Sequence, residues 1–229
     1  MHISVEKTVK QKLSNNIVST AERVSIVHLP HQSLDLVADA AIRLNDQAGS
    51  SKAIPHVAAR SIRSQPELDS FIQTCLNNSI NTVLLIGGNP TTGIVYQNAF
   101  DVAKQFAGTD IKLLCGRYPE KDTKSGIARK LLVFDGSISQ LCLNPSLLKN
   151  FTNWTTVGVP SMTDAAGIWR YLKLCGAGSS AKYLLQSWRG VFYLNSKGFN
   201  TKRFVDAVGH NQYHVYNFGN LEKTLESLL

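Results

Sequence analysis

Eight short apolar runs, each followed by a segment with helical character, limit the possible folds of this chain more than any other feature. Between the runs, apolar residues recur at helical spacing, as at Leu68, Phe71, Ile72, Cys75 and Leu76. Alternation of strands and helices on this scale predicts a parallel sheet, and eight strands favour a closed (β/α)8 TIM barrel over an open doubly wound sheet. The predicted strands are 3–9, 23–29, 52–59, 81–87, 110–116, 137–143, 155–159 and 212–218.

The length of the chain adds a condition on the loops. At 229 residues the chain is short for such a barrel, for which about 250 residues is typical. We therefore expect short loops and a single barrel domain over residues 1–229. The run at 191–195 is a candidate ninth strand at the periphery, and Ser64-Gln-Pro-Glu67 predicts a helix start with a capping box.

Composition excludes several classes of protein. A hydrophobic content of 43% and a charged content of 17% are those of a globular chain and not of a disordered one. The charged N-terminal stretch does not resemble a signal peptide, and no apolar run is long enough to span a bilayer, so a cytoplasmic protein is expected. The four cysteines lie far apart, and His28 and His31 at a strand end do not share a face, so no metal site is expected.

The charge balance favours anionic ligands. Lys and Arg exceed Asp and Glu by 24 − 16 = 8, which suits nucleotides, phosphorylated cofactors or polycarboxylates. The densest basic stretch predicts a solvated helix face, because no nucleic-acid motif accompanies it. Neither nucleic acid nor a membrane is expected as a partner, and a homo-oligomer or an accessory partner is left open. The basic stretch comprises Lys112, Arg117, Lys121, Lys124, Arg129 and Lys130.

Polar residues near the predicted strand ends are the candidates for a site, since chemistry in a TIM barrel gathers at the carboxyl ends of its strands. Alternation along 3–9 places Glu6 on the face opposite Val5, inside the barrel; a surface glutamate on a misplaced strand is the alternative. Pro55 removes a ladder donor from a strand that has no free edge, which is expected at a functional position. His56 follows it; a histidine satisfied in the core and a ligand contact are both open for this residue.

Three further segments carry candidate residues. The turn 87–93 (GGNPTTG) is neither a dinucleotide-binding motif nor a P-loop; a plain turn or a close backbone approach to a flat ligand would explain it. Gln140 can both donate and accept hydrogen bonds at the edge of a pterin or flavin ring. The segment 175–180 (CGAGSS) predicts a helix end and a new helix start, a geometry that also suits an anion.

Taken together, these segments resemble the methylenetetrahydrofolate reductase family along the whole chain. SVEKTVK resembles the first family strand with its glutamate, and RVSIVHLP the second. IPHVAARSIRSQPEL is similar to the strand built around a Pro-His pair, and VLLIGGN to the one ending in Gly-Asp. GRYPE, ISQLCLNP, KLCGAGSSAKYL and YHVYNFGNLEKTLESL resemble later family segments in the right order. The fold that the resemblance implies is again a (β/α)8 barrel.

The resemblance also implies residue roles. Glu6 would be the general acid that opens the five-membered ring of the folate. Gln140, Asn89 and Tyr216 would bind the folate, a tetrahydrofolate derivative. FAD would supply the hydride and NAD(P)H would re-reduce it, giving 5-methyltetrahydrofolate for one-carbon metabolism and methionine biosynthesis. The residues in contact with FAD would be His28, His56, Gly87, Gly88, Asn89, Tyr118 and Glu120, with Arg129 and Lys130 at the FAD phosphates.

The chain departs from the family pattern at several positions. Asn89 stands where the reductases have an aspartate, and NFG (217–219) replaces a Leu-Asn-Arg end of the last strand. Several loops that would surround FAD are short. Three functions therefore stay open: a flavin-dependent reductase, a flavin-free tetrahydrofolate-dependent methyltransferase or demethylase, and a non-catalytic folate-binding protein of the same superfamily.

Overall fold

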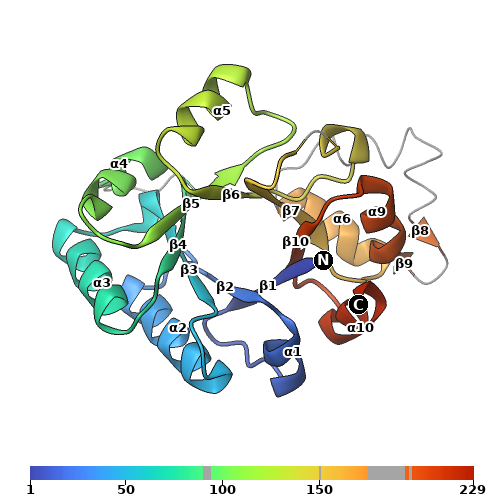
Figure 1. The fold of residues 1–229 in the computed structure, drawn as a ribbon, viewed down its shortest axis with the longest axis horizontal. Helices are drawn as coiled ribbons and strands as arrows, with labels where there is room; N and C mark the ends of the chain where they lie inside the picture. The colour runs from blue at the N-terminus through green and yellow to red at the C-terminus, as the bar shows by residue number, and fades with distance from the viewer. Residues whose placement is uncertain (90–93, 150, 175–193, 196–197) are drawn as a thin grey trace. The chain divides into compact units, whose positions relative to one another are not determined.

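The barrel strands occur where the sequence predicts them (Figure 1). The computed structural model describes residues 1–89, 94–149, 151–174, 194–195 and 198–229. Eight parallel strands close a barrel in the order β1-β10-β7-β6-β5-β4-β3-β2, so the predicted (β/α)8 TIM barrel is confirmed. These strands are β1 (His2–Thr8), β2 (Arg23–Val27), β3 (Ala53–Ala58), β4 (Thr82–Ile86), β5 (Lys112–Arg117), β6 (Gly136–Ser139), β7 (Thr155–Pro160) and β10 (Gln212–Tyr216).

Helices alternate with these strands, and short polar residues start many of them. The side chains of Ser14, Ser33, Ser64, Asn200 and Asn220 each accept a hydrogen bond from a backbone N–H at the start of the following helix. The helices are α1 (Asn15–Thr20), α2 (Leu34–Ala48), α3 (Gln65–Asn77), α4 (Ala99–Ala103), α5 (Lys124–Leu131), α6 (Ala165–Leu174), α9 (Thr201–Val208) and α10 (Leu221–Leu228). Single 3-10 turns occur at η1 (Ala59–Ser61), η2 (Lys104–Phe106) and η3 (Pro145–Leu147).

The capping box before α3 forms in a modified way. The Ser64 hydroxyl accepts from Glu67 N at 3.3 Å, as predicted. The Glu67 carboxylate does not return to Ser64; it accepts from Arg63 N at 2.8 Å and from Leu34 N at 3.1 Å, at the start of α2. One carboxylate therefore serves the N-termini of two neighbouring helices, which favour negative charge.

Several strands end earlier than predicted. β2 ends at Val27, β4 at Ile86, β6 at Ser139 and β10 at Tyr216. His28 and Gln140 therefore lie just after their strands. Of the candidate ninth strand, the structure describes β8 (Leu194–Asn195), which pairs antiparallel with β9 (Gly198–Phe199) outside the barrel. Residues 191–193 lie outside the described part.

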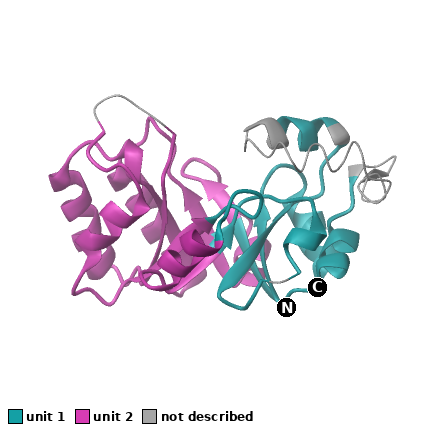
Figure 2. Cartoon of the chain, turned by 90° about the horizontal axis from the view of Figure 1, so that it is seen from above, with its two compact units in different colours: residues 1–5, 117–123, 138–229 teal, residues 6–116, 124–137 magenta. Residues whose placement is uncertain are grey.

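Contacts divide the chain into two compact units, coloured separately in Figure 2. Unit 1 comprises residues 1–5, 117–123 and 138–229, and unit 2 comprises residues 6–116 and 124–137. The expectation of a single domain over residues 1–229 stays a prediction. Among the residues that the structure describes, no helix has both the length and the apolar character needed to cross a membrane.

The core of unit 2 is built from β3 and its neighbours. All six residues of β3 are buried, and Val57 and Leu85 are in register and fully buried. Cys75 of α3 is also fully buried, and burial raises the pKa of its thiol to about 12. The thiol therefore stays protonated as a small core side chain.

Candidate functional site

His28, at the carboxyl end of β2, is a structural residue in unit 2. It is 3% exposed. Its Nδ1 accepts from Ala58 N at 3.2 Å, and its Nε2 lies 3.1 Å from Gln32 O. Because the amide can only donate and the carbonyl can only accept, the ring is the neutral tautomer with its proton on Nε2. Both ring nitrogens are thus engaged within the protein, and the side chain continues the β2 ladder after the strand has ended.

The protonation of His28 is disfavoured by its surroundings. Burial lowers the pKa of His28, and Arg63 lowers it further, against the raising effects of the Gln32 carbonyl and Glu67. A proton on Nδ1 would also remove the acceptor for Ala58 N. The neutral form is therefore the one that fits the fold.

Arg60, which follows β3 in η1, holds the turn after β4. Its Nη1 donates to Gly88 O at 2.9 Å and its Nε to Gln97 O at 3.0 Å. The backbone N–H of Arg60 donates to Gly87 O at 3.1 Å. The segment after β4 is thus fastened to the end of β3.

Gly88 of this turn has a packing reason. Gly88 has φ +73°, and a Cβ there would lie 3.0 Å from Ala58 Cβ. The backbone of Gly88 therefore comes close to β3, which favours the plain-turn explanation. Asn89 follows and is exposed, and residues 90–93 lie outside the described part.

Pro55 and His56 lie where the pairing of β3 changes. β2 pairs with β3 through Pro55, which is opposite Ile26, whereas the register between β3 and β4 begins at His56, opposite Leu84. The missing donor of Pro55 thus falls just before the second ladder begins. His56 is 6% exposed and lies on the strand face opposite Val57.

Glu6 lies within β1, the strand that the sequence predicts. Val5 is fully buried, and Ser4, on the same face as Glu6, bonds His214 Nδ1 with its Oγ at 2.9 Å. Glu6 itself is half-buried. The general-acid role stays a prediction.

The basic pair proposed for the phosphates lies on α5 and the two side chains have different partners. The Arg129 guanidinium stacks over the Phe100 ring, 4.2 Å from its centroid. Lys130 Nζ donates to Gly116 O at 2.9 Å, at the end of β5. Stacking uses the face of the Arg129 guanidinium, so its N–H groups, which lie in the plane of the guanidinium, can still donate to an anion. The Lys130 ammonium has three N–H donors, of which the bond to Gly116 O uses one.

In unit 1, Gln140 and Tyr216, two of the residues that the resemblance assigns to the folate, lie close together. The Tyr216 hydroxyl lies 2.9 Å from Ser139 O and 3.4 Å from Gln140 Oε1. The Tyr216 ring stacks on Phe218 with centroids 5.6 Å apart and planes 11° apart. Gln140 and Phe218 are both half-buried, so this β6–β10 cluster (Ser139, Gln140, Gly158, Tyr216 and Phe218) offers an amide and an aromatic face.

Gly158 of β7 makes the close packing of this cluster possible. A Cβ at Gly158 would lie 2.3 Å from Ser139 O and 2.6 Å from Tyr216 Cε2, distances that real side chains do not show. The Ser139 hydroxyl in turn accepts from Gly158 N at 2.8 Å. The tyrosine ring therefore occupies the space that a side chain at Gly158 would take.

Arg117, at the end of β5, forms a buried ion pair that sequence reasoning did not find. Its Nε lies 3.0 Å from Asp122 Oδ2, its Nη1 donates to Thr155 Oγ1 at 3.1 Å, and its guanidinium lies 4.1 Å from the Phe151 centroid. Asp122 also accepts from Tyr118 N at 3.2 Å. The pair shapes the turn that carries Tyr118, which is 41% exposed, and Glu120, which is half-buried.

Nothing in the sequence marks this pair, because Arg117 and Asp122 lie in a stretch that contains several other charged residues of both signs.

The predicted segment 175–180 lies outside the described residues. Within the described part of the chain, no group of His, Cys, Asp and Glu could hold a metal ion.

Comparisons with known proteins support the fold alone. No family model matches the chain, and no curated protein matches it. A GH18 chitinase from the chitin utilization locus of Flavobacterium johnsoniae has a TM-score of 0.52 and 10% sequence identity, over 99% of this chain and 92% of that one. An AP endonuclease, family 2, from Brucella melitensis has a TM-score of 0.48 and 11% identity, over 99% of this chain and 96% of that one. At such low identity the likeness to the chitinase concerns the barrel and not its chemistry.

Proposed function

We propose that this chain is an enzyme that binds a reduced folate and belongs to the methylenetetrahydrofolate reductase type, converting 5,10-methylenetetrahydrofolate to 5-methyltetrahydrofolate. The observation that supports the proposal most is the β6–β10 cluster. It places the Gln140 amide 3.4 Å from the Tyr216 hydroxyl, and Tyr216 stacks on Phe218. This cluster lies at the carboxyl ends of two barrel strands, where TIM-barrel sites occur.

The chemistry of a pterin suits these groups. A pterin is flat and presents adjacent donors and acceptors along one edge, which a carboxamide can satisfy with two hydrogen bonds. An aromatic face adds stacking. Glu6 would donate the proton to the amine nitrogen as the folate ring opens, as the resemblance implies.

The residues proposed for FAD fit it unequally. Arg129 and Lys130 retain a geometry compatible with phosphate oxygens. His28 does not fit a flavin contact, because both of its ring nitrogens are engaged with Ala58 N and Gln32 O. When bound, FAD would supply the hydride, with NAD(P)H as co-substrate.

A second candidate is the flavin-free, tetrahydrofolate-dependent methyltransferase or demethylase. The engagement of His28 and the presence of Asn89 in place of an aspartate favour it. Both candidates share the folate site and differ in the flavin.

Folate binding is the first experiment. A calorimetric titration of the purified protein with tetrahydrofolate should show saturable binding. Gln140→Met keeps the size of the side chain and removes its hydrogen bonds, so we expect about a tenfold loss of affinity, or about 1.4 kcal/mol. Gln73→Met, at an exposed position of α3, is the matched control and should bind normally. Equal affinity of both variants would contradict the assignment of Gln140.

The visible absorption spectrum, with and without added FAD, separates the two candidates. Flavin bands that persist through gel filtration favour the reductase, and a colourless protein that still binds folate favours methyl transfer. In either case Glu6→Gln should bind folate and lose turnover; unchanged turnover would rule out the general-acid role.

A further inference from the structure

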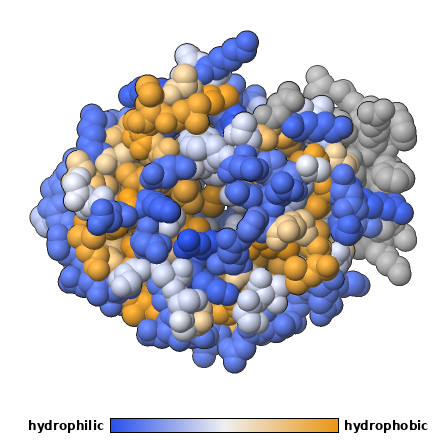
Figure 3. All heavy atoms as spheres, viewed as in Figure 1, coloured by the Kyte–Doolittle hydropathy of each residue, from blue (hydrophilic) through white to orange (hydrophobic). Residues whose placement is uncertain are grey.

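α5 carries an exposed apolar end that the proposed function does not use. No residue of α5 is buried. Leu131, Leu132 and Val133, at and just after its C-terminus, are 52%, 87% and 44% exposed. Figure 3 shows hydrophobic surface over the part of the molecule where Figure 1 places α5. Isolated exposed aliphatic residues are ordinary, but three consecutive ones of this exposure indicate an interaction site.

The base of this segment is packed, so the exposed residues are held in place. Phe134 is 4% exposed and meets Phe100 edge-on, with ring centroids 5.3 Å apart. Arg129 stacks on the same Phe100 ring. Val133 N and Phe134 N both donate to Lys130 O, at 3.1 Å and 3.0 Å. The chain therefore turns at Val133 with Phe134 inside and the three aliphatic residues outside.

The charged residues of α5 all have one sign. α5 contains Lys124, Arg129 and Lys130 and no acidic residue. The nearest acid in the sequence, Asp135, is engaged, because its Oδ2 accepts from Leu113 N at 2.8 Å. The apolar end is thus bordered by cations, on a chain of net charge +8.

The charge and the shape favour one occupant. A second copy of this chain would bring the same cations against these, which is unfavourable. A helix partner would need an apolar stripe at helical spacing, whereas these three residues are consecutive, and Leu132 and Val133 lie in the turn after α5. An exposed apolar tip with a basic border suits a deformable anionic surface, where apolar insertion and electrostatic attraction add.

We propose that the end of α5 docks this protein on an anionic phospholipid surface, with Leu131, Leu132 and Val133 inserted among the lipids and Lys124 against their headgroups. This is peripheral binding and requires no spanning helix. It departs from the expectation, drawn from sequence, that a membrane is not a partner.

Vesicle co-sedimentation tests the proposal. The full chain should pellet with vesicles of phosphatidylcholine and phosphatidylserine, should not pellet with pure phosphatidylcholine, and should be released by high salt. Leu132→Ser should weaken partitioning about tenfold, since a largely exposed leucine contributes by insertion alone. Lys124→Gln should weaken it about fivefold through the loss of one headgroup-facing charge.

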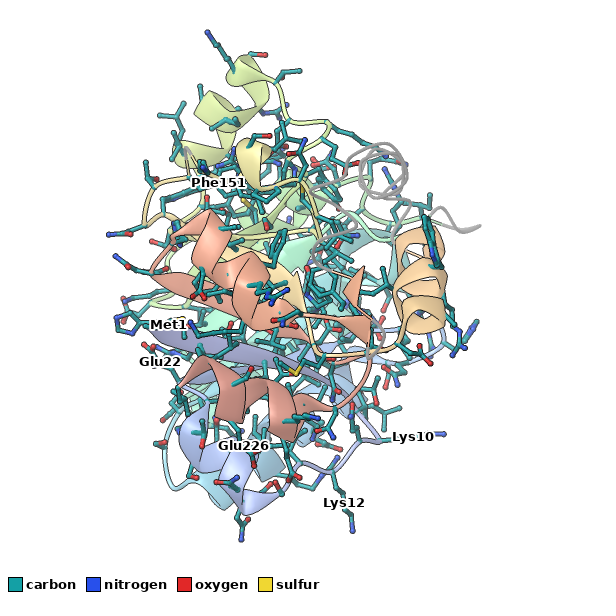
Figure 4. All side chains as sticks on the ribbon, turned by 90° about the vertical axis from the view of Figure 1, so that its right-hand side faces the viewer. Met1, Lys10, Lys12, Glu22, Phe151 and Glu226 are labelled. Atoms are coloured by element: carbon teal, nitrogen blue, oxygen red, sulfur yellow. The ribbon has the colours of Figure 1, made fainter. Side chains whose placement is uncertain are left out.

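Matched variants separate the site from general properties of the chain. Leu36→Ser changes a leucine of α2 that is 47% exposed and lies beside Asp35, and it should partition as the parent does. Lys12→Gln removes the same charge elsewhere; Figure 4 shows its side chain extending away from the ribbon.

Three results would overturn the proposal. One is the absence of binding to the anionic vesicles at low salt. Another is equal binding by Leu132→Ser and the parent. The third is an equal loss on Lys12→Gln and Lys124→Gln, which would show that net charge alone acts. Concentration-dependent self-association abolished by Leu132→Ser, without vesicle binding, would assign the tip to a second copy instead.

Discussion

Several side chains in this protein form hydrogen bonds with backbone groups at the ends of strands and helices, where no backbone partner is present. His28 provides the acceptor that β2, which ends at Val27, no longer offers to Ala58 N. Lys52 acts similarly at the end of α1: its Nζ donates to Val18 O and Ala21 O, both at 2.8 Å. Such side chains satisfy buried backbone groups at element ends, which would otherwise cost free energy.

The role of His28 predicts a dependence of stability on pH. Because the pKa of His28 is lowered in the fold, the unfolded chain takes up a proton first as pH falls below about 6.5. The free energy of unfolding should therefore decrease as pH falls from 7 through that value, until the native pKa is reached. Denaturant unfolding across this range measures it.

Substitution separates His28 from the other titrating groups. His28→Asn can still accept from Ala58 N but cannot titrate, so its stability should change less with pH than that of the parent. His31→Asn, at an exposed neighbouring position, should keep the parental slope. If His28→Asn kept the parental dependence of stability on pH, the assignment would be contradicted.

The free energy of unfolding of His28→Ala should be lower by about 1–3 kcal/mol at pH 7, because Ala58 N is left without an acceptor.

At the scale of elements, β6, β7 and β10 are joined by one tyrosine. Tyr216 bonds Ser139 O, lies against the backbone of Gly158 and stacks on Phe218. The Ser161 hydroxyl, just after β7, also accepts from Phe218 N at 2.9 Å. The proposed folate contacts are therefore parts of the packing between strands.

Gly158→Ala should disturb both stability and folate binding. The new methyl would meet Ser139 O and the Tyr216 ring at distances below 3 Å, and one of the contacts is backbone. We expect a loss of about 1–3 kcal/mol and weaker tetrahydrofolate binding. Gly87→Ala is a control for stability, because its nearest contact is Arg60 Nη1 at 3.9 Å. Thermal unfolding measures the stability of each variant, and calorimetry measures its affinity for tetrahydrofolate. If Gly158→Ala had the stability and the affinity of the parent, the proposed packing constraint would be refuted.

At the scale of the whole molecule, ligand binding and stability are linked. A reduced folate that binds the folded chain and not the unfolded one should raise the free energy of unfolding by about 2.7 kcal/mol at a hundredfold excess over its Kd. The midpoint of thermal unfolding should rise with tetrahydrofolate concentration, and the rise should be smaller in Gln140→Met at the same concentration. The absence of any shift at saturating folate would argue against the proposed function.

The eight strands and the order of helices between them could be predicted from sequence, because burial leaves a period in the apolar residues. The alternation that buries Val5 and places Glu6 on the other face is local, and so is the Ser64 cap of α3. These features depend on residues a few positions apart, whose spacing alone sets their geometry.

What the sequence determined by itself is thus the barrel and the type of residue at each strand end. Only the tertiary structure decided what those residues contact. It engages both nitrogens of His28, turns Arg60 onto the carbonyls of Gly88 and Gln97, pairs Arg117 with Asp122, and leaves Leu132 in solvent. The physical reason is that strand pairing and loop closure bring these positions together from distant parts of the chain. The spacing of polar residues in the sequence does not indicate which residues they contact in the fold.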